Sequence, residues 1–337
     1  MRVTHVRAAV ITGASSGIGR ATAIELARRG FSVALAARRA EPLRTLAQQI
    51  ETSGGTAIVV PTDVTDEAAV EALADRASRE LGGFEVWVNN AAVYLAGRFE
   101  DVPSDAFRQV IETNLMGYTY GARAALRHFR ARGAGTLINN ASLGGKLAMP
   151  YFSAYTASKF AIYGLSRALR EELRGTNIRV CVVLPATIDT PIFQHAGNFD
   201  GRQLDVMQPV YDAGRVARAI GRLAEKPRSE IVVGTIAKLL LALARFAPDL
   251  AQRIVTREVE GGHFSQTPLP PSAGNLFQPV AEGADVSGGW PQVNAVSGWA
   301  AAAAAFIRAK QPAGPTSQHR GKSHQASPAP SPLPSAT

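Results

Sequence analysis

One short segment near the start of the chain limits the possible folds most: a glycine-rich turn directly after an apolar run. The run is Ala8-Ala9-Val10-Ile11, and the turn, Thr12 to Gly19, has the spacing G-x-x-x-G-x-G. An apolar strand that breaks into such a turn and then enters a helix presents backbone N–H groups to a phosphate. Gly13 permits a tight turn, Gly17 lets a pyrophosphate approach closely, and Gly19 lets the helix lie near the strand. Taken alone, the segment is also compatible with a turn that binds nothing.

Beyond this turn, short apolar runs alternate with amphipathic helical patterns. The expected strands are 6–12, 31–37, 56–60, 84–89, 135–141, 177–184 and 231–234, and the expected helices are 17–29, 41–53, 66–81, 104–131, 154–174 and 213–225. This alternation predicts an α/β fold, a Rossmann-type doubly wound parallel sheet of about seven strands with helices on both faces. Ligands of such folds bind at the carboxyl ends of the strands, where the strand order reverses. We therefore expect a site beside Thr12 and Asn89, where the first and fourth strands end.

The composition of the chain changes toward its C-terminus. We expect a nucleotide-binding catalytic domain over 1–235, a C-terminal extension over 236–310 and a disordered Pro/Ser-rich tail over 311–337. The tail has too few large apolar side chains to offset the entropy lost on ordering. Within the extension, residues 236–250 set an apolar stripe on one helical face, formed by Ile236, Leu239, Leu240, Leu243 and Phe246. The stripe predicts packing against the body or a neighbouring subunit, and the alternative is a helix that lies on a membrane surface.

The charge of the chain, formally +9, raises the question of a nucleic-acid partner. The arginines are dispersed and no recognition-helix or RNA-stacking signature is present, so we expect no such partner. The single cysteine excludes a disulfide within the chain, which suits a reducing compartment. The sequence shows neither an apolar secretory leader nor an uninterrupted transmembrane segment, so we expect a cytoplasmic protein. Peripheral membrane association through 236–250 is the alternative. None of the histidines has metal-ligand spacing, so we expect no metal.

A tyrosine and a lysine four residues apart carry the expected chemistry. Tyr155 and Lys159 lie on one face of the helix that begins there. A phenol with a pKa near ~10 exchanges protons slowly at neutral pH, and a nearby ammonium favours the phenolate. Lowering that pKa to about 7 requires roughly 4 kcal/mol of preferential stabilisation of the anion. Lys159 and a positively charged cofactor ring together are expected to supply it in a water-poor site.

The pair stands among other motifs in a fixed order. They are the glycine turn, Asp63-Val64, Asn89-Asn90-Ala91-Ala92, Asn114, Ser142, Tyr155 with Lys159, and Pro185 to Thr190. In this order and spacing, residues 6–235 resemble the short-chain dehydrogenase/reductase family. Two departures, Ala92 and Ala186 where the family usually has glycine, affect fine geometry and not the expected reaction.

The resemblance implies a role for each matched residue. Tyr155 is expected to be the acid/base at a carbonyl or alcohol oxygen, Ser142 to orient that oxygen, Lys159 to hold the nicotinamide ribose, and Asn114 to anchor a water of a proton path. Asn89 is expected to close the cofactor cleft, Asp63 to meet the adenine ring, and Pro185 to Thr190 to lie against the nicotinamide. The expected cofactor-binding set is Thr12, Gly13, Ser15, Ser16, Gly17, Ile18, Gly19, Arg38, Arg39, Asp63, Val64, Asn89, Ala91, Tyr155, Lys159, Pro185, Ile188 and Thr190.

The end of the second strand predicts which nicotinamide cofactor is used. NAD-binding members usually carry an acidic residue there, which binds the ribose 2′-hydroxyl. This chain has Ala37 at that place, followed by Arg38 and Arg39. Because guanidinium groups form charge-assisted contacts with a 2′-phosphate, we expect NADP(H) rather than NAD(H), with Ser15 or Ser16 assisting.

The substrate is less clearly encoded. The expected lid, Ile188 to Tyr211, and the facing wall contain many apolar residues, namely Ile192, Phe193, Phe199, Leu204 and Met207, and Leu143, Met149, Tyr151, Phe152 and Tyr94. They favour an apolar carbonyl or alcohol, and an acyl-thioester ketone and a sterol- or retinoid-like alcohol both remain open. The resemblance also implies a homodimer or homotetramer formed through helices 104–131 and 154–174. The alternative function is a regulator that binds NADPH without turnover, against which the complete Asn114, Ser142, Tyr155 and Lys159 set argues.

Overall fold

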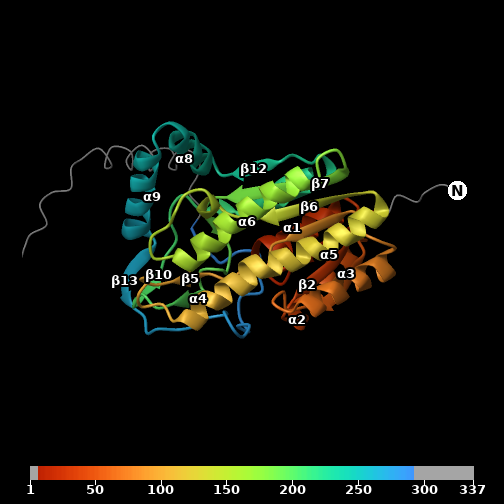
Figure 1. The fold of residues 1–337 in the computed structure, drawn as a ribbon. Helices are drawn as coiled ribbons and strands as arrows, with labels where there is room; N and C mark the ends of the chain where they lie inside the picture. Colours follow the sequence, from red (N-terminus) through yellow and green to blue (C-terminus); the bar gives the residue numbers. More distant parts are fainter. Residues whose placement is uncertain (1–6, 292–337) are drawn as a thin grey trace, which may run out of the picture.

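A seven-stranded parallel sheet forms the centre of the computed structural model, which describes residues 7–291 (Figure 1). Its strands are β1 (Ala8–Thr12), β2 (Ser32–Ala37), β3 (Ala57–Pro61), β4 (Val86–Asn89), β6 (Ala134–Asn140), β7 (Asn177–Pro185) and β12 (Glu230–Val233). The strand order β12-β7-β6-β4-β1-β2-β3 reverses between β1 and β4. The expected doubly wound sheet is therefore confirmed, and its switch point lies where the sequence placed the site.

Helices cover both faces of the sheet because successive strand residues point to opposite sides. In β1, Ala9 and Ile11 pack with α1 (Gly17–Arg28), α2 (Ala40–Thr52) and α7 (Ala213–Glu225). Ala8 and Val10 pack on the other face with α3 (Glu67–Leu81) and α5 (Gly117–Arg132). The neighbouring helices α4 (Ser104–Ile111) and α6 (Ser153–Glu172) complete this second layer. Each face of the sheet thus has its own apolar core.

One expected helix differs in its interior. Residues 104–131 do not form a single regular α-helix, because a π-helical turn at Glu112–Met116 separates α4 from α5. The backbone N–H of Gly117 reaches back to the carbonyl of Glu112 across this turn. Such wide turns occur often at functional sites, and this one contains the predicted site residue Asn114.

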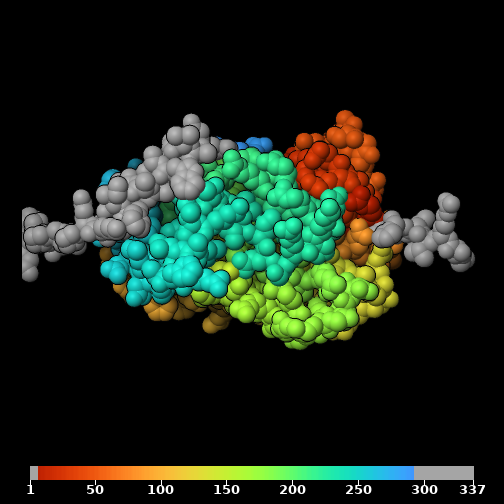
Figure 2. Space-filling view, turned by 90° about the horizontal axis from the view of Figure 1, so that it is seen from above, coloured from red at the N-terminus to blue at the C-terminus, as the bar shows by residue number. Residues whose placement is uncertain are grey.

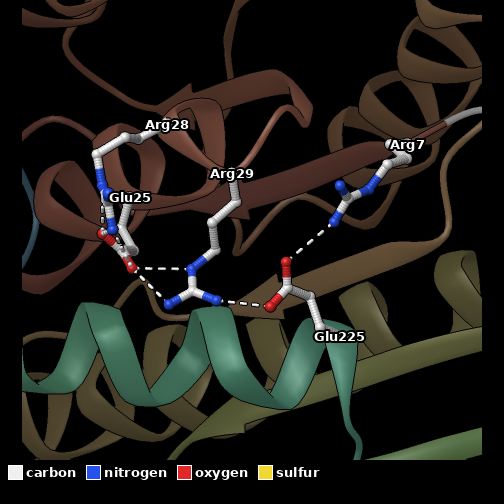
Figure 3. Close-up of polar contacts among 5 residues, drawn as sticks. All are labelled: Arg7, Glu25, Arg28, Arg29 and Glu225. Carbon is white, nitrogen blue, oxygen red and sulfur yellow. Dashed lines mark hydrogen bonds and ion pairs between the residues drawn. The ribbon is translucent and has the colours of Figure 1, made fainter.

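An ion-pair cluster joins the C-terminal ends of α1 and α7 (Figure 3). Arg29 bridges Glu25, at 2.8 Å, and Glu225, at 2.6 Å, and Arg7 contacts Glu225 at 3.1 Å. Burial alone raises the pKa of Glu25, but hydrogen bonds and charges from Arg29 and Arg28 outweigh it, so that pKa is lowered. The cluster fixes the layer behind the glycine turn and lies at the opposite end of α1 from that turn.

The C-terminal extension packs on one end of the sheet. The helix expected over 236–250 ends earlier, because the chain turns at Ala247 and a new helix starts at Pro248, where proline is favoured. The extension comprises α8 (Thr235–Phe246), α9 (Pro248–Gly262) and β13 (Phe264–Pro268). Figure 2 shows the cyan residues of α8 and α9 at the opposite end from the red residues that begin the fold. No helix within residues 7–291 is long and apolar enough to cross a membrane.

Three short strand pairs fix the lid region, and one of them, β10 with β13, connects it to the extension. β13 pairs antiparallel with β10 (Arg202–Leu204), β8 (Ile188–Asp189) pairs with β11 (Tyr211–Asp212), and β5 (Leu95–Ala96) pairs with β9 (Gly197–Asn198). The last part of the expected extension, 292–310, and the expected tail, 311–337, lie outside the described residues.

Candidate active site

The glycine turn forms a tight cradle between β1 and α1. Gly13 has a φ of 67°, and a Cβ atom there would lie 2.7 Å from the Cα of Ala91. A Cβ at Gly19 would lie 2.1 Å from the carbonyl oxygen of Gly13. Asn90 ties the turn to the end of β4, since its side-chain amide donates to the carbonyls of Thr12 at 3.0 Å and Gly13 at 3.3 Å. Only glycine fits at Gly13 and Gly19, because a side chain at either position would collide with the neighbouring backbone.

A cleft of about 210 Å³ opens over this cradle at the switch point of the sheet. Most of the predicted cofactor residues line it: Gly13, Ser15, Ser16, Gly17, Ile18, Arg38, Arg39, Asp63, Val64, Ala91, Tyr155, Lys159, Pro185, Ile188 and Thr190. Thr12 and Gly19 lie behind the lining, where Thr12 accepts the backbone N–H groups of Asn90 and Ala91 through its hydroxyl. They shape the cleft and do not face it.

Asn89 is placed differently from the expectation. Its side chain is buried inside the protein, where it donates to Asn139 and to the carbonyl of Tyr118 and accepts from Trp87. Consecutive strand residues point to opposite sides, so the next residue, Asn90, lines the cleft instead. Of the two asparagines, Asn90 and not Asn89 lines the cleft.

Tyr155, Ser142 and Lys159 meet at the inner end of the cleft. Burial raises the pKa of Tyr155 to about 12, against which a hydrogen bond with Ser142 acts to lower it. Burial lowers the pKa of Lys159 to about 7, and its Nζ donates to the carbonyl of Asn140 at 3.2 Å. That Nζ lies 5.4 Å from the centre of the Tyr155 ring. In the protein without cofactor, Tyr155 is therefore a neutral phenol, and the lowering of its pKa expected from Lys159 together with a cofactor ring stays a prediction.

Asn114 lies behind these residues in the π-helical turn and is fully buried. Its Oδ1 accepts the backbone N–H of Val93 at 2.8 Å, and its Nδ2 donates to the carbonyl of Val93 and to Ser158. The side chain thus joins the loop after β4 to α6, the helix that carries Tyr155. Its expected role in holding a water stays a prediction.

A second, smaller cavity of about 120 Å³ adjoins the cleft. Tyr155 and Ser142 border both spaces. The wall contains five of the residues expected there, Tyr94, Leu143, Met149, Phe193 and Met207, and also Leu147, Ile236, Leu240 and Val255. The expected residues Tyr151, Phe152, Phe199 and Leu204 pack behind the wall in the apolar cores, and Ile192 lines the cleft. The sequence reasoning missed the contribution of α8 and α9 to this wall; the apolar stripe was an available signal for α8 but not for α9.

A buried Tyr94–His263 pair supports the tyrosine from the side of the extension. The hydroxyl of Tyr94 lies 2.9 Å from Nε2 of His263, and the Tyr94 ring meets that of Tyr155 edge-on at 4.6 Å. Burial lowers the pKa of His263 to about 4, so this imidazole is uncharged at neutral pH. The pair links α9 to the candidate catalytic residue without placing a charge beside it.

A segment of the extension borders the outer side of the cleft, a role that the sequence did not indicate. Asn275, Pro279 and Val280 line the cleft beside Arg38 and Arg39. Asp63, at the same side, accepts the backbone N–H and the hydroxyl of Thr65 and so fixes its own turn. The described residues hold no cluster of side chains suited to bind a metal ion.

A model of the family described as short chain dehydrogenase matches residues 7–200. The chain belongs to this family. Among its relatives, the uncharacterized oxidoreductase YxnA of Bacillus subtilis is 37% identical over 78% of this short-chain dehydrogenase and 75% of its own length. The cis-4-hydroxycyclohexanecarboxylate dehydrogenase of Sinomonas cyclohexanicum is 37% identical over 68% of this chain and 93% of its own.

Solved structures of the family share the fold of this dehydrogenase. An alcohol dehydrogenase from Thermococcus sibiricus, in complex with 5-hydroxy-NADP, superposes with a TM-score of 0.60 at 27% identity, over 67% of this chain and 95% of its own. A short-chain dehydrogenase/reductase from Burkholderia phymatum, in complex with NAD, superposes with a TM-score of 0.64 at 27% identity, over 72% of this chain and 93% of its own. The chain is therefore an oxidoreductase of a family that binds nicotinamide cofactors.

The residues of this dehydrogenase fit such a cofactor. The glycine cradle leaves bare backbone beside the cleft, and a Cβ atom at Gly13 or Gly19 would collide with atoms of the protein itself. In addition, the Oδ1 atom of Asn140, which borders the cleft, is buried and has no hydrogen-bond partner among the described residues. A buried acceptor of this kind calls for a donor from a ligand or a water.

Proposed function

We propose that this dehydrogenase interconverts a carbonyl and a secondary alcohol with NADP(H), using Tyr155 as the acid/base. One observation carries the proposal: Tyr155 and Ser142 border both the cofactor cleft and the apolar cavity. Any small molecule in the cavity therefore meets a phenol and a hydroxyl at its boundary with the cleft. The nicotinamide, when bound, supplies or accepts the hydride.

In the protein without cofactor, the protonation state of Tyr155 favours carbonyl reduction, the direction in which the phenol gives up a proton. With a pKa of about 12, Tyr155 holds its proton at neutral pH and can give it to a carbonyl oxygen. Ser142 orients that oxygen by a hydrogen bond. Lys159, with a pKa of about 7, changes its charge near neutral pH beside Tyr155. In the oxidation direction, the charged form of Lys159 is the one that favours the phenolate.

Arginines at the end of β2 support NADP(H) over NAD(H). Arg38 and Arg39 face the cleft, and Ala37 stands where NAD-binding members usually carry a carboxylate. Two guanidinium groups attract a 2′-phosphate by charge-assisted hydrogen bonds. The solved relatives divide between a complex with a modified NADP and one with NAD, so the argument rests on these side chains.

An apolar ring ketone or the corresponding alcohol is the proposed substrate class. Most of the cavity wall is formed by aliphatic and aromatic side chains, and the polar residues Thr187, Gln208 and Glu258 line the rest. The Sinomonas relative, which matches over 93% of its own length, acts by its name on cis-4-hydroxycyclohexanecarboxylate. A substituted cyclohexanone is thus a reasonable first compound to assay.

The test is NADPH oxidation by the full chain against ketones, aldehydes and quinones, including substituted cyclohexanones, with NADH in parallel. Turnover that is lost in Tyr155→Phe, while NADPH binding persists, supports the proposed reaction. A higher kcat/KM with NADH would contradict the proposed cofactor. Tight NADPH binding without turnover on any compound would instead favour the regulatory alternative. The proposed dimer or tetramer is checked by sedimentation of the same sample.

A further inference from the structure

Residues 272–290, here named the strap, run from the extension back across the outer side of the cofactor cleft. In Figure 1 the strap is the blue segment after β13 that runs back toward the orange-red α2. Leu276 fixes one end: it is fully buried against Leu95 and Val93, next to Gly197. An apolar side chain inserted in this way holds a segment that has little regular secondary structure.

The other end of the strap is held by buried polar contacts. Asp189 accepts the backbone N–H groups of Gly288 at 2.9 Å and Trp290 at 3.1 Å, together with the hydroxyl of Ser287. The indole N–H of Trp290 donates to the carbonyl of Thr190 at 3.2 Å. These bonds attach the strap to the segment that borders the inner part of the cleft.

Between its two attachments, the strap covers the arginines at the end of β2. Arg38 donates to the carbonyls of Asn275 at 2.7 Å, Phe277 at 3.1 Å and Leu276 at 3.4 Å. Arg39 donates to the carbonyls of Glu282 at 2.7 Å, Val280 at 3.0 Å, Gly283 at 3.2 Å and Ala281 at 3.2 Å. The guanidinium groups that would attract a 2′-phosphate are therefore already bonded to neutral main-chain oxygens.

The strap also engages the phosphate-binding turn. The backbone N–H of Gly17, at the N-terminal end of α1, donates to the carbonyl of Asp285 at 2.9 Å. Free N–H groups at a helix N-terminus are the groups that usually contact a phosphate. The strap thus supplies uncharged acceptors to two kinds of donor that an anionic nucleotide would also use.

We propose that the strap sets the cofactor selectivity of this dehydrogenase by competing with the 2′-phosphate of NADP(H) for Arg38 and Arg39; this rests on the proposed function. A phosphate forms stronger bonds with a guanidinium than a neutral carbonyl does, so NADP(H) displaces the 275–283 carbonyls. That displacement lowers the affinity for NADP(H), whereas NAD(H) has no 2′-phosphate and leaves the contacts of Arg38 and Arg39 in place. The bond from Gly17 to Asp285 does not distinguish the two cofactors, because both carry a pyrophosphate. The strap therefore reduces the ratio of NADP(H) affinity to NAD(H) affinity below the value that the two arginines alone would give.

Equilibrium binding to a strap variant tests the proposal. Leu276→Ser removes the apolar attachment and leaves the cleft side chains and the main-chain carbonyl that Arg38 contacts unchanged in sequence. Leu269→Ser, at a half-exposed position before the strap, is the matched control. We expect Leu276→Ser to bind NADPH about tenfold more tightly, equivalent to about one net hydrogen bond. NADH affinity should stay within about twofold, and the control should match the unmodified chain.

Other binding outcomes overturn the proposal. Equal weakening of both cofactors in Leu276→Ser would show that the strap is a wall that retains the nucleotide. Unchanged affinities for both cofactors would show that the strap does not act on binding. These binding measurements do not depend on turnover. The proposed reaction is tested separately, and it fails if turnover survives in Tyr155→Phe.

Hydrogen–deuterium exchange of the unmodified chain gives a second test that does not depend on a variant that folds. Saturating NADPH should increase amide exchange in peptides covering 275–283, while NADH should not. The attachment at 287–290 should keep its protection with either cofactor. Increased protection of 275–283 by NADPH would overturn the competition, because it would mean that the strap closes on the phosphate.

Discussion

The cofactor cleft and the adjoining apolar cavity share Tyr155 and Ser142 but are held in place by different kinds of contact. Around the cleft, bare backbone and short polar contacts at strand ends determine the shape, as in the bonds from Asn90 to Thr12 and Gly13. Around the cavity the wall is mostly apolar, and α8 and α9 add Ile236, Leu240 and Val255 to it. The sheet thus positions the candidate reacting groups, while the extension contributes to the wall of the cavity beside them.

This difference separates two kinds of change. A substitution at the cleft is expected to alter the reaction or the choice of cofactor, because each residue there has a specific polar task. A substitution in the extension is expected to alter substrate fit or stability, because the apolar residues there act by filling space and neighbouring side chains can partly adjust to a change in volume. The following predictions test that division, beginning with the largest expected effect.

Loss of the Tyr155 hydroxyl should have the largest effect. Tyr155→Phe removes the proposed proton donor, and a positioned acid or base contributes about 10²–10⁴-fold to a rate. We expect kcat to fall by about that factor while NADPH affinity, measured by fluorescence titration, changes little. Tyr163→Phe, on the same helix, is the control and should retain activity. A residual rate above about a tenth of the original would remove Tyr155 from the acid/base role.

Protonation of His263 should destabilise the extension in acid. Its pKa of about 4 in the folded protein lies below the ordinary value of 6.5, so the unfolded chain binds more protons between these values. The stabilisation is complete above about pH 6.5 and is lost as the pH falls toward 4, amounting to about 3 kcal/mol.

Urea unfolding at several pH values checks this slope. His263→Gln keeps an amide that can bond Tyr94 but cannot titrate, so its free energy of unfolding should vary less between pH 6.5 and 4. His128→Gln is the matched control, because burial also lowers the pKa of His128, which is less buried than His263. Equal slopes for the unmodified chain and His263→Gln would contradict the prediction.

Arg38 should affect the choice of cofactor and little else. Arg38→Ala is expected to weaken NADPH binding by about tenfold to a hundredfold, because a hydrogen bond to a charged group contributes about 1.5–3 kcal/mol. NADH binding should change far less, since NADH lacks the 2′-phosphate. Arg44→Ala, at an exposed residue of α2, is the control. Parallel weakening of both cofactors would place Arg38 at a group that they share.

The fold and the position of the cleft could be predicted because their signals are local in sequence. The seven strands follow apolar runs, and the cleft follows from glycine spacing and from the strand ends. Asn89 and Asn90 show the limit: adjacent asparagines look alike in sequence, and only the register of β4 decides which one faces the cleft. The bonds from Arg38 to Asn275 could not be predicted, because they join main-chain carbonyls to residues far away in sequence, and carbonyls leave no sequence pattern.

The smallest expected effect lies in α8, where two adjacent leucines separate substrate fit from helix stability. Leu240 lines the apolar cavity, whereas Leu239 is 41% exposed. Leu240→Ala should lower kcat/KM for a bulky cyclic ketone by about fourfold to tenfold, since each methylene of lost contact costs about 0.8 kcal/mol. Acetone reduction should be nearly unchanged, because so small a ketone makes few contacts with the wall. Leu239→Ala should leave both substrates unaffected, and equal losses in the two variants would mean that α8 acts only through the stability of the extension.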